Sequence, residues 1–141
     1  MAQAPKKPRP VPTPSSFTRE FWQGTRQGKL LLQRCRACGT RQYYPRPVCM
    51  RCMARDLEWT EAAGRGTVYS FTVTRLPPEG FEGRAPYVLV AVDLPEGVRM
   101  LGTLLDVDPG EVRIGMPVRA TYERLTDEIS LVQFTPDRPA S

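Results

Sequence analysis

The sequence of 141 residues contains no histidine. This absence excludes the most common general base, the Ser–His and Cys–His nucleophile systems, and every zinc site with mixed cysteine and histidine ligands. Only three lysines are present, so catalysis by the chain alone would depend on Asp, Glu, Tyr or one of those lysines. This small set of acid–base groups argues against an autonomous enzyme. A hydratase or thioesterase acting by itself is therefore the weakest functional hypothesis.

Long hydrophobic runs are also absent. The longest covers eight residues, 87–94, which is far too short to cross a bilayer. The opening stretch, MAQAPKKPRPVPTPSS, lacks the apolar segment of a signal peptide. We therefore expect a cytoplasmic protein with no membrane partner. In a reducing compartment, four cysteines in two close pairs are typical of metal ligands and not of disulfides.

The four cysteines form two Cys-x-x-Cys pairs separated by ten residues. Two such turns facing each other would place four thiolates around one ion with no open position, which suits structural zinc. Iron in a rubredoxin-like site would use the same ligands, so both metals remain open. Gly39 follows the first pair, where a positive φ is favourable, whereas Met53 follows the second pair and predicts a less regular turn. The predicted ligands are Cys35, Cys38, Cys49 and Cys52.

Charge is distributed unevenly along the chain. Residues 1–56 carry twelve Lys or Arg and two acids, a charge of +10, whereas residues 57–141 carry eight Arg and thirteen acids, a charge of −5. The basic half suits the phosphates of a nucleic acid or of a nucleotide cofactor, or an acidic protein partner. A merely solvated basic face is the alternative.

The chain divides into five predicted segments. They are a Pro-rich tail at 1–14, a helix and lead-in strand at 15–33, a zinc ribbon at 34–60, a barrel at 61–137 and a C-terminal tail at 138–141. We expect the helix to run from Ser15 or Ser16 through Gln27, with Gly28 just past its end. Strand patterns follow at 67–76, 87–94, 98–105, 118–125 and 129–134. The predicted fold is mainly β and ends in a five-stranded OB-fold barrel, with an SH3-like barrel as the alternative.

An OB-fold raises the hypothesis of single-stranded nucleic-acid binding, because such barrels often stack bases on aromatic rings. Tyr69, Phe71 and Arg75 alternate along one predicted strand. That strand lies in the acidic half of the chain, however, which repels a polyanion. The two rings fit a barrel core at least as well, so nucleic-acid binding remains the alternative function.

Six stretches, in chain order from residue 21 to residue 137, resemble a single family. They are FWQGTRQGKLLLQRCRACG, YYPRPVCMRC, LEWTEAAGRGTVYSFTV, APYVLVAVDLPEGVRMLGTLL, IGMPVRATYE and LVQFTPD. Together they resemble the acyl-CoA-associated family with a rubredoxin-like zinc ribbon and a C-terminal OB-fold, long catalogued as a domain of unknown function.

The resemblance implies a non-catalytic accessory subunit that docks on a thiolase-superfamily enzyme and shapes its acyl-CoA channel. Such partners include thiolases and the lipid-transfer-protein-like aldolases that trim steroid side chains. A two-plus-two hetero-oligomer is the expected assembly, with acyl-CoA contacted indirectly. Which acyl group is processed, and whether the partner cleaves or condenses, stays open.

Two sets of side chains are candidates for contacts in such a complex. Arginine suits phosphate, and large rings dominate interface energies. For Trp22 the alternative is packing within the chain's own barrel. The candidates for coenzyme A phosphates or an acidic partner are Arg34, Arg36, Arg41 and Arg46. The candidates for the channel or the partner are Phe17, Phe21, Trp22, Phe81 and Tyr87.

Overall fold

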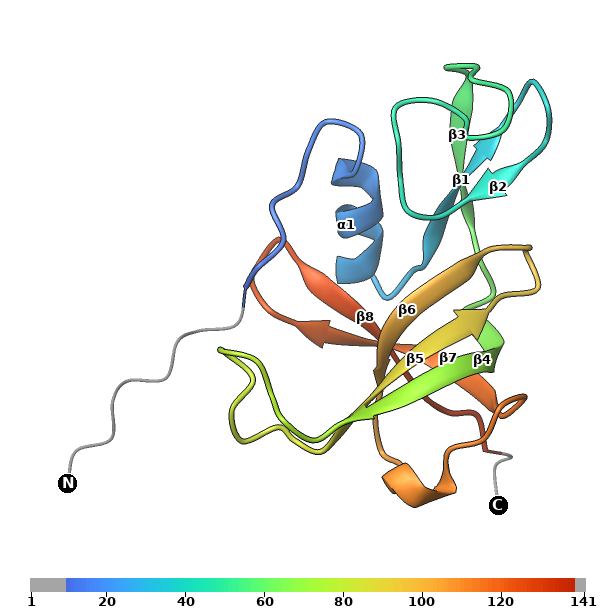
Figure 1. Cartoon of the computed structure of the whole chain (residues 1–141). Coiled ribbons are helices and arrows are strands. Elements are labelled where there is room, and N and C mark those ends of the chain that lie inside the picture. Colours follow the sequence, from blue (N-terminus) through green and yellow to red (C-terminus); the bar gives the residue numbers. More distant parts are fainter. Residues whose placement is uncertain (1–9, 139–141) are drawn as a thin grey trace.

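Figure 1 shows the computed structural model of the chain, which describes residues 10–138 as a short helix, a small sheet and a barrel. Helix α1 (Arg19–Arg26) and the small sheet both stand above the barrel in this view. The strands of the small sheet are β1 (Leu31–Cys35), β2 (Arg41–Gln42) and β3 (Leu57–Glu61). Within the described residues, no helix is long and apolar enough to cross a membrane.

The barrel contains five strands in the closed order β4-β5-β6-β8-β7. Neighbours are antiparallel, except that β6 and β8 meet in parallel at Leu104 and Phe134. This arrangement agrees with the predicted OB-fold and not with the SH3-like alternative. The strands are β4 (Arg65–Thr74), β5 (Tyr87–Asp93), β6 (Arg99–Leu104), β7 (Pro117–Arg124) and β8 (Ser130–Pro136). A single 3₁₀ turn, η1 (Pro109–Glu111), lies in the predicted linker before β7.

The five barrel strands begin and end within two residues of their predicted bounds. The lead-in strand was expected to end at residue 33, whereas β1 continues to Cys35, the first cysteine. Strands β2 and β3 were not predicted. The predicted tails fall largely on residues 1–9 and 139–141, which lie outside the described part of the chain.

The barrel core is made mainly of aliphatic side chains together with the Phe134 ring, and most of them alternate inward along the strands. Val68, Val92 and Phe134 are fully buried within it. Two glycines permit close packing. A Cβ at Gly66 would lie 2.4 Å from the carbonyl oxygen of Asp93, and one at Gly102 would lie 3.0 Å from the Phe134 ring. Strand β4 also carries a register shift between Val68 and Ser70. Such an irregularity bends a strand, which helps this long one pair with both β5 and β7.

Helix α1 begins later than predicted. The Thr18 hydroxyl accepts a hydrogen bond from Ser15 N, and Thr18 N donates to Ser15 O, so these residues close a turn before the helix starts at Arg19. The predicted end is confirmed, since Gly28 has a φ of 71° and follows the last helical turn. Thr25 Oγ1 accepts a hydrogen bond from Ser130 N, which ties the helix to the start of β8.

Candidate metal centre and adjoining grooves

The structure brings the four predicted cysteine ligands together. Their sulfur atoms all lie within 4.8 Å of one another, and none of the four forms a disulfide. The Cys35–Cys52 and Cys38–Cys49 pairs of sulfurs are each 3.6 Å apart. A tetrahedral zinc ion with Zn–S bonds of about 2.3 Å requires sulfurs about 3.8 Å apart. The site therefore has the size and the donor set of a four-thiolate metal cage.

Both Cys-x-x-Cys turns have the same backbone hydrogen bonds. Gly39 N donates to Cys35 O at 2.8 Å, and Met53 N donates to Cys49 O at 3.0 Å. The two donor residues share the left-handed conformation, with φ of 79° and 67°. The predicted irregularity of the second turn is therefore wrong, because Met53 adopts a conformation that ordinarily favours glycine.

Local hydrogen bonds favour the thiolate form at two ligands. The backbone N–H groups of Cys52 and Arg51 point at Cys49 Sγ, at 3.5 and 3.4 Å, and lower the pKa of the Cys49 thiol. A hydrogen bond between Cys38 and the Thr40 side chain lowers the pKa of the Cys38 thiol to about 6. Metal binding requires deprotonated cysteine, which these contacts favour at Cys38 and Cys49. At Cys52 a hydrogen bond with the Ala54 backbone lowers the pKa of the thiol, but the neighbouring Cys35 sulfur and burial outweigh it and raise that pKa to about 11.

Two buried glutamines hold the loop between the cysteine pairs. Gln42 Nε2 donates to Gln33 Oε1 at 2.8 Å and also to Val48 O at 3.1 Å. Gln33 in turn contacts the backbone of Arg46 twice, with Nε2 donating to Arg46 O and Oε1 accepting from Arg46 N. Gln42 Oε1 accepts from Met50 N. These glutamines were not predicted, because nothing in their spacing in the sequence marks them as buried.

The structure separates the four predicted arginines into two pairs. Arg34 and Arg36 are held by acids, because both contact Glu58 and Arg36 also contacts Asp56. Hydrogen bonds from Arg34 and then Arg36 hold the pKa of Glu58 below its ordinary value. Arg41 and Arg46 have no ion pair among residues 10–138. They instead line an open groove of about 570 Å³ between the small sheet and the barrel.

Arg51 and Arg99 line the same groove and were missed as candidates. Arg51 lies between the cysteines of the second pair, and Arg99 begins β6 on the barrel. The Arg99 guanidinium lies 3.4 Å from the centre of the Tyr69 ring and also bonds Asp93. No sequence signal joins Arg99 to the ribbon, since their meeting depends on the placement of two separate sheets.

The five aromatic residues predicted to contact the channel or the partner lie in different environments. Phe21 and Trp22 are only 1% and 6% exposed and pack within the chain itself, which favours the core alternative. Phe17 precedes the helix and is 38% exposed. Phe81 and Tyr87 have ring centres 6.0 Å apart and line a hollow of about 430 Å³.

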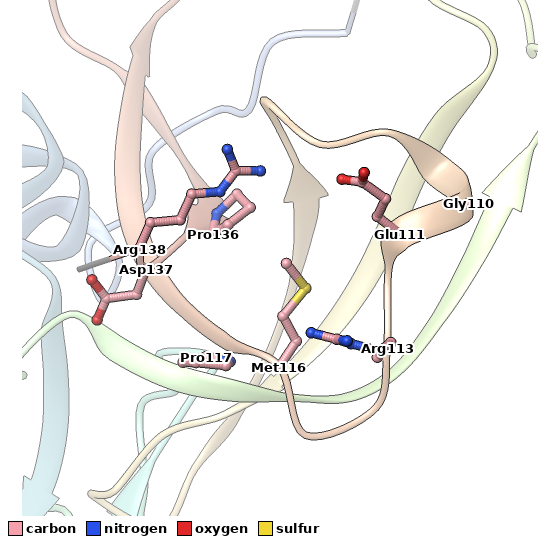
Figure 2. A pocket seen from close by; sticks show the side chains of 8 residues that line it. All are labelled: Gly110, Glu111, Arg113, Met116, Pro117, Pro136, Asp137 and Arg138. Atoms are coloured by element: carbon pink, nitrogen blue, oxygen red, sulfur yellow. The ribbon is translucent and has the colours of Figure 1, made fainter. Parts of the chain in front are cut away.

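A separate hollow of about 500 Å³ lies between η1 and the end of β8. Figure 2 shows Met116 near its middle, with the Glu111 and Arg113 side chains directed towards it and Arg138 on the opposite side. The Asp137 carboxylate points away and lies 3.7 Å from Arg65. Because both signs of charge border this hollow, its electrostatics select no class of ligand.

Two family models match adjacent parts of the chain. The model described as the ChsH2 rubredoxin-like zinc ribbon domain matches residues 22–58. The model described as the ChsH2 C-terminal OB-fold domain matches residues 59–123. Together with the strand order, these matches confirm the predicted fold class.

Known proteins resemble the chain over most of its length. A probable enoyl-CoA hydratase alpha subunit from Thermomonospora curvata is 38% identical over 97% of this chain. The chain spans only 43% of the length of that relative. A DUF35 domain-containing scaffold protein from Methanocaldococcus jannaschii is 36% identical, over 67% of this chain and 68% of its own. Among solved structures, a chain of an Ltp2-ChsH2(DUF35) aldolase matches with a TM-score of 0.80 and 35% identity, covering 89% of this chain and 98% of that one.

Proposed function

Since this chain belongs to the DUF35 family, with its ChsH2-type zinc ribbon and OB-fold, we propose that it is a non-catalytic accessory subunit of an acyl-CoA enzyme. The partner is an enzyme of the thiolase superfamily, of the thiolase or aldolase type. This chain docks on that partner and forms part of the wall of its acyl-CoA channel. The observation that carries the proposal is the structural match to nearly the whole of one chain of an Ltp2-ChsH2 aldolase.

The chemistry of the described residues supports an accessory role. The four cysteines lie together in one cage, and a four-thiolate site leaves no open position on a metal for a substrate. A metal bound there would supply a structural cross-link. The donor set and the sulfur spacing fit zinc, which is the metal we assign. The acids and bases of catalysis then come from the partner, and we place the complex in the cytoplasm as a two-plus-two assembly.

Single-stranded nucleic acid is a weaker candidate for the ligand. The predicted stacking platform on β4 is reduced, because Arg99 covers one face of the half-exposed Tyr69 ring and Phe71 packs against the barrel core. Base stacking on an aromatic platform needs an accessible ring face. No observation on β4 favours this alternative over the accessory role.

Affinity capture from the native lysate tests the proposal. Tagged protein is purified with and without nuclease, and the bound proteins are identified and quantified by mass spectrometry. We expect a thiolase-superfamily protein in near-equal amount that survives nuclease treatment. The purified partner is then assayed for turnover of acyl-CoA with and without this chain, and we expect turnover to rise when the chain is added.

Two results would contradict the proposal. One is recovery of only those partners that disappear with nuclease, which would return the barrel to nucleic acid. The other is turnover of an acyl-CoA by this chain alone, with loss of that activity when one Asp or Glu is replaced.

A further inference from the structure

The two cysteine turns meet at the end of the small sheet that lies away from the barrel (Figure 1). Residues 36–39 are exposed throughout, and so are residues 52–53 and Arg55. We call these residues the knuckle face. They line none of the hollows described above, whereas Met50 and Arg51 of the second turn line the open groove beside the barrel. The knuckle face is therefore a surface separate from that groove.

The second cysteine turn has a methionine where glycine would fit. Met53 N donates to Cys49 O, and Gly39 N makes the equivalent bond in the first turn. Because this bond comes from the backbone, it needs no side chain at either position. A φ of 67° is unfavourable for methionine and acceptable for glycine. The fold alone would thus favour glycine at position 53.

The Met53 side chain gains little from its own chain. It is 69% exposed and takes no part in the hydrophobic core. Unfavourable backbone conformations persist where the surrounding structure or a function maintains them, and they cluster at binding sites and switch regions. Since neither the cage nor the core needs this side chain, a contact outside the chain accounts for it.

The cage itself is shielded on one side only. Cys35 and Cys49 are buried, whereas Cys38 and Cys52 are exposed. Both exposed thiols belong to the knuckle face. A metal held by the four sulfurs would therefore be open to solvent and to competing ligands from this side. A second protein surface placed against the knuckle face would complete the shield.

The composition of the knuckle face indicates which chemistry would cover it. Methionine and arginine are enriched at the centres of protein interfaces and lysine is depleted, and this face has Met53, Arg36, Arg55 and no lysine. Arg36 is held by Asp56 and Glu58, whereas Arg55 has no ion pair among residues 10–138. A guanidinium only donates hydrogen bonds, and a carboxylate accepts two of them at once. The complementary surface is an apolar pocket with a carboxylate at its rim.

We propose that the knuckle face is a contact surface for the partner enzyme. Met53 inserts into an apolar pocket of that enzyme, and Arg55 pairs with a carboxylate at the rim of the pocket. The contact covers Cys38 and Cys52, so docking and metal retention strengthen each other by the same factor, as linkage requires. The identity of the partner as a thiolase-superfamily enzyme rests on the proposed function. The proposal adds the place of contact and its coupling to the metal.

Titration of the partner enzyme, purified after its capture, with the metal-loaded full chain tests the contact at Met53. Met53→Gly relieves the left-handed backbone but removes the side chain. We expect this variant to hold its metal more tightly and to bind the partner about tenfold more weakly. A purely structural role would change both affinities in the same direction. Met53→Leu keeps an apolar side chain of similar volume and should bind the partner nearly as tightly as the unaltered chain.

Matched controls lie on the barrel. Ile114 is 71% exposed, so Ile114→Gly removes an equally exposed apolar side chain and should leave the affinity for the partner unchanged. Arg55→Gln should weaken docking several-fold at low salt and less at high salt, because the charged contact is screened. Arg75 is also exposed and has no ion pair within residues 10–138, and Arg75→Gln should have no such effect. Thermal melting of each variant confirms that it is folded.

The rate of metal loss to a chelator tests whether docking covers the cage. We expect the unaltered chain to lose its metal several-fold more slowly in the complex than alone. In a mixture with the same concentration of partner, Met53→Gly should lose most of this protection, although its metal is held more tightly when the chain is alone.

Each contrary result has a distinct meaning. Equal binding of the captured enzyme by Met53→Gly and the unaltered chain would overturn the knuckle contact and leave the proposed function in place. Failure to capture any thiolase-superfamily enzyme would remove both. Equal rates of metal loss from the free and the docked chain would overturn the covering of the cage. Self-association of the purified chain that Met53→Gly abolishes would assign the face to a second copy, which also overturns the proposal.

Discussion

The ribbon and the barrel are held together by different chemistry. The barrel packs a contiguous set of apolar side chains that includes Val68, Met100 and Phe134. From β1 to β3, only two of the six buried side chains are plain hydrocarbon; the six are Leu32, Gln33, Cys35, Gln42, Pro45 and Cys49. The barrel therefore relies on the burial of apolar surface, whereas the ribbon relies on amide hydrogen bonds and on four thiols positioned to bind a metal.

This difference reflects the sizes of the two parts. A segment of about 25 residues cannot enclose a sufficient apolar core, and small folds commonly depend on a metal or a disulfide. The barrel closes on itself and leaves no free strand edge. It follows that the two parts should respond differently to metal removal and to loss of core volume.

Metal removal should produce the largest effect and should act on the ribbon. Chelation, or the substitution Cys38→Ser at an exposed ligand, removes a binding free energy on the order of 10 kcal/mol. We expect β1, β2 and β3 to lose protection against hydrogen exchange while β5 and β6 keep theirs. Metal analysis by mass spectrometry and residue-resolved exchange measure both effects. A Cys38→Ser chain with unchanged metal content and melting temperature would show that the thiols only pack together.

Loss of core volume should act on the barrel, with a smaller effect. Phe134 is fully buried and its ring packs against Gly102, so Phe134→Ala should lower the free energy of unfolding by about 3–5 kcal/mol. Urea unfolding followed by circular dichroism measures this loss. At low urea the variant should still bind one metal ion per chain. Leu101→Ala, at an exposed position of the same barrel, is the control and should change stability by about 0.5 kcal/mol or less. A loss below 1 kcal/mol for Phe134→Ala would contradict the assignment of this ring to the core.

The smallest expected effect on stability concerns the left-handed conformation of Met53 in the ribbon. Left-handed backbone is strained for methionine but not for glycine, so Met53→Gly should stabilise the ribbon by about 0.5–1 kcal/mol after the entropy cost of glycine. Competition with a chelator should show a several-fold gain in metal affinity. The matched control is Gly39→Ala at the equivalent position of the first turn, which should lower metal affinity. Equal affinities for Met53→Gly and the unaltered chain would mean that the turn is not strained.

Features determined by local sequence were the easiest to predict. The spacing of the cysteines identified the four thiols that the structure brings together, and alternating apolar residues identified the barrel strands. Strand β3 was missed because its sequence, LEWTE, carries two acids and becomes a strand through pairing with β1. That same pairing places Glu58 opposite Arg34, which explains why two of the predicted arginines are already held by acids.

Features that depend on the packing of distant segments could not be predicted. The basic groove joins Arg41 on β2 to Arg99 on β6, and these residues belong to separate sheets. The burial of Trp22 likewise follows from the placement of α1 on the barrel, where Thr25 contacts Ser130. Residue type alone could not decide between a contact with a partner and a contact within the chain, because arginine and tryptophan occur in both.

The paired contacts of Gln33 with the backbone of Arg46 have a consequence for the kinetics of binding. One amide group fixes both the N–H and the C=O of this residue, so the main chain at Arg46 is ordered before any ligand arrives. An arriving anion would then need to order only the arginine side chain, which reduces the loss of conformational entropy on association. Encounter with the groove would be limited by diffusion and electrostatic attraction instead of by rearrangement of the loop.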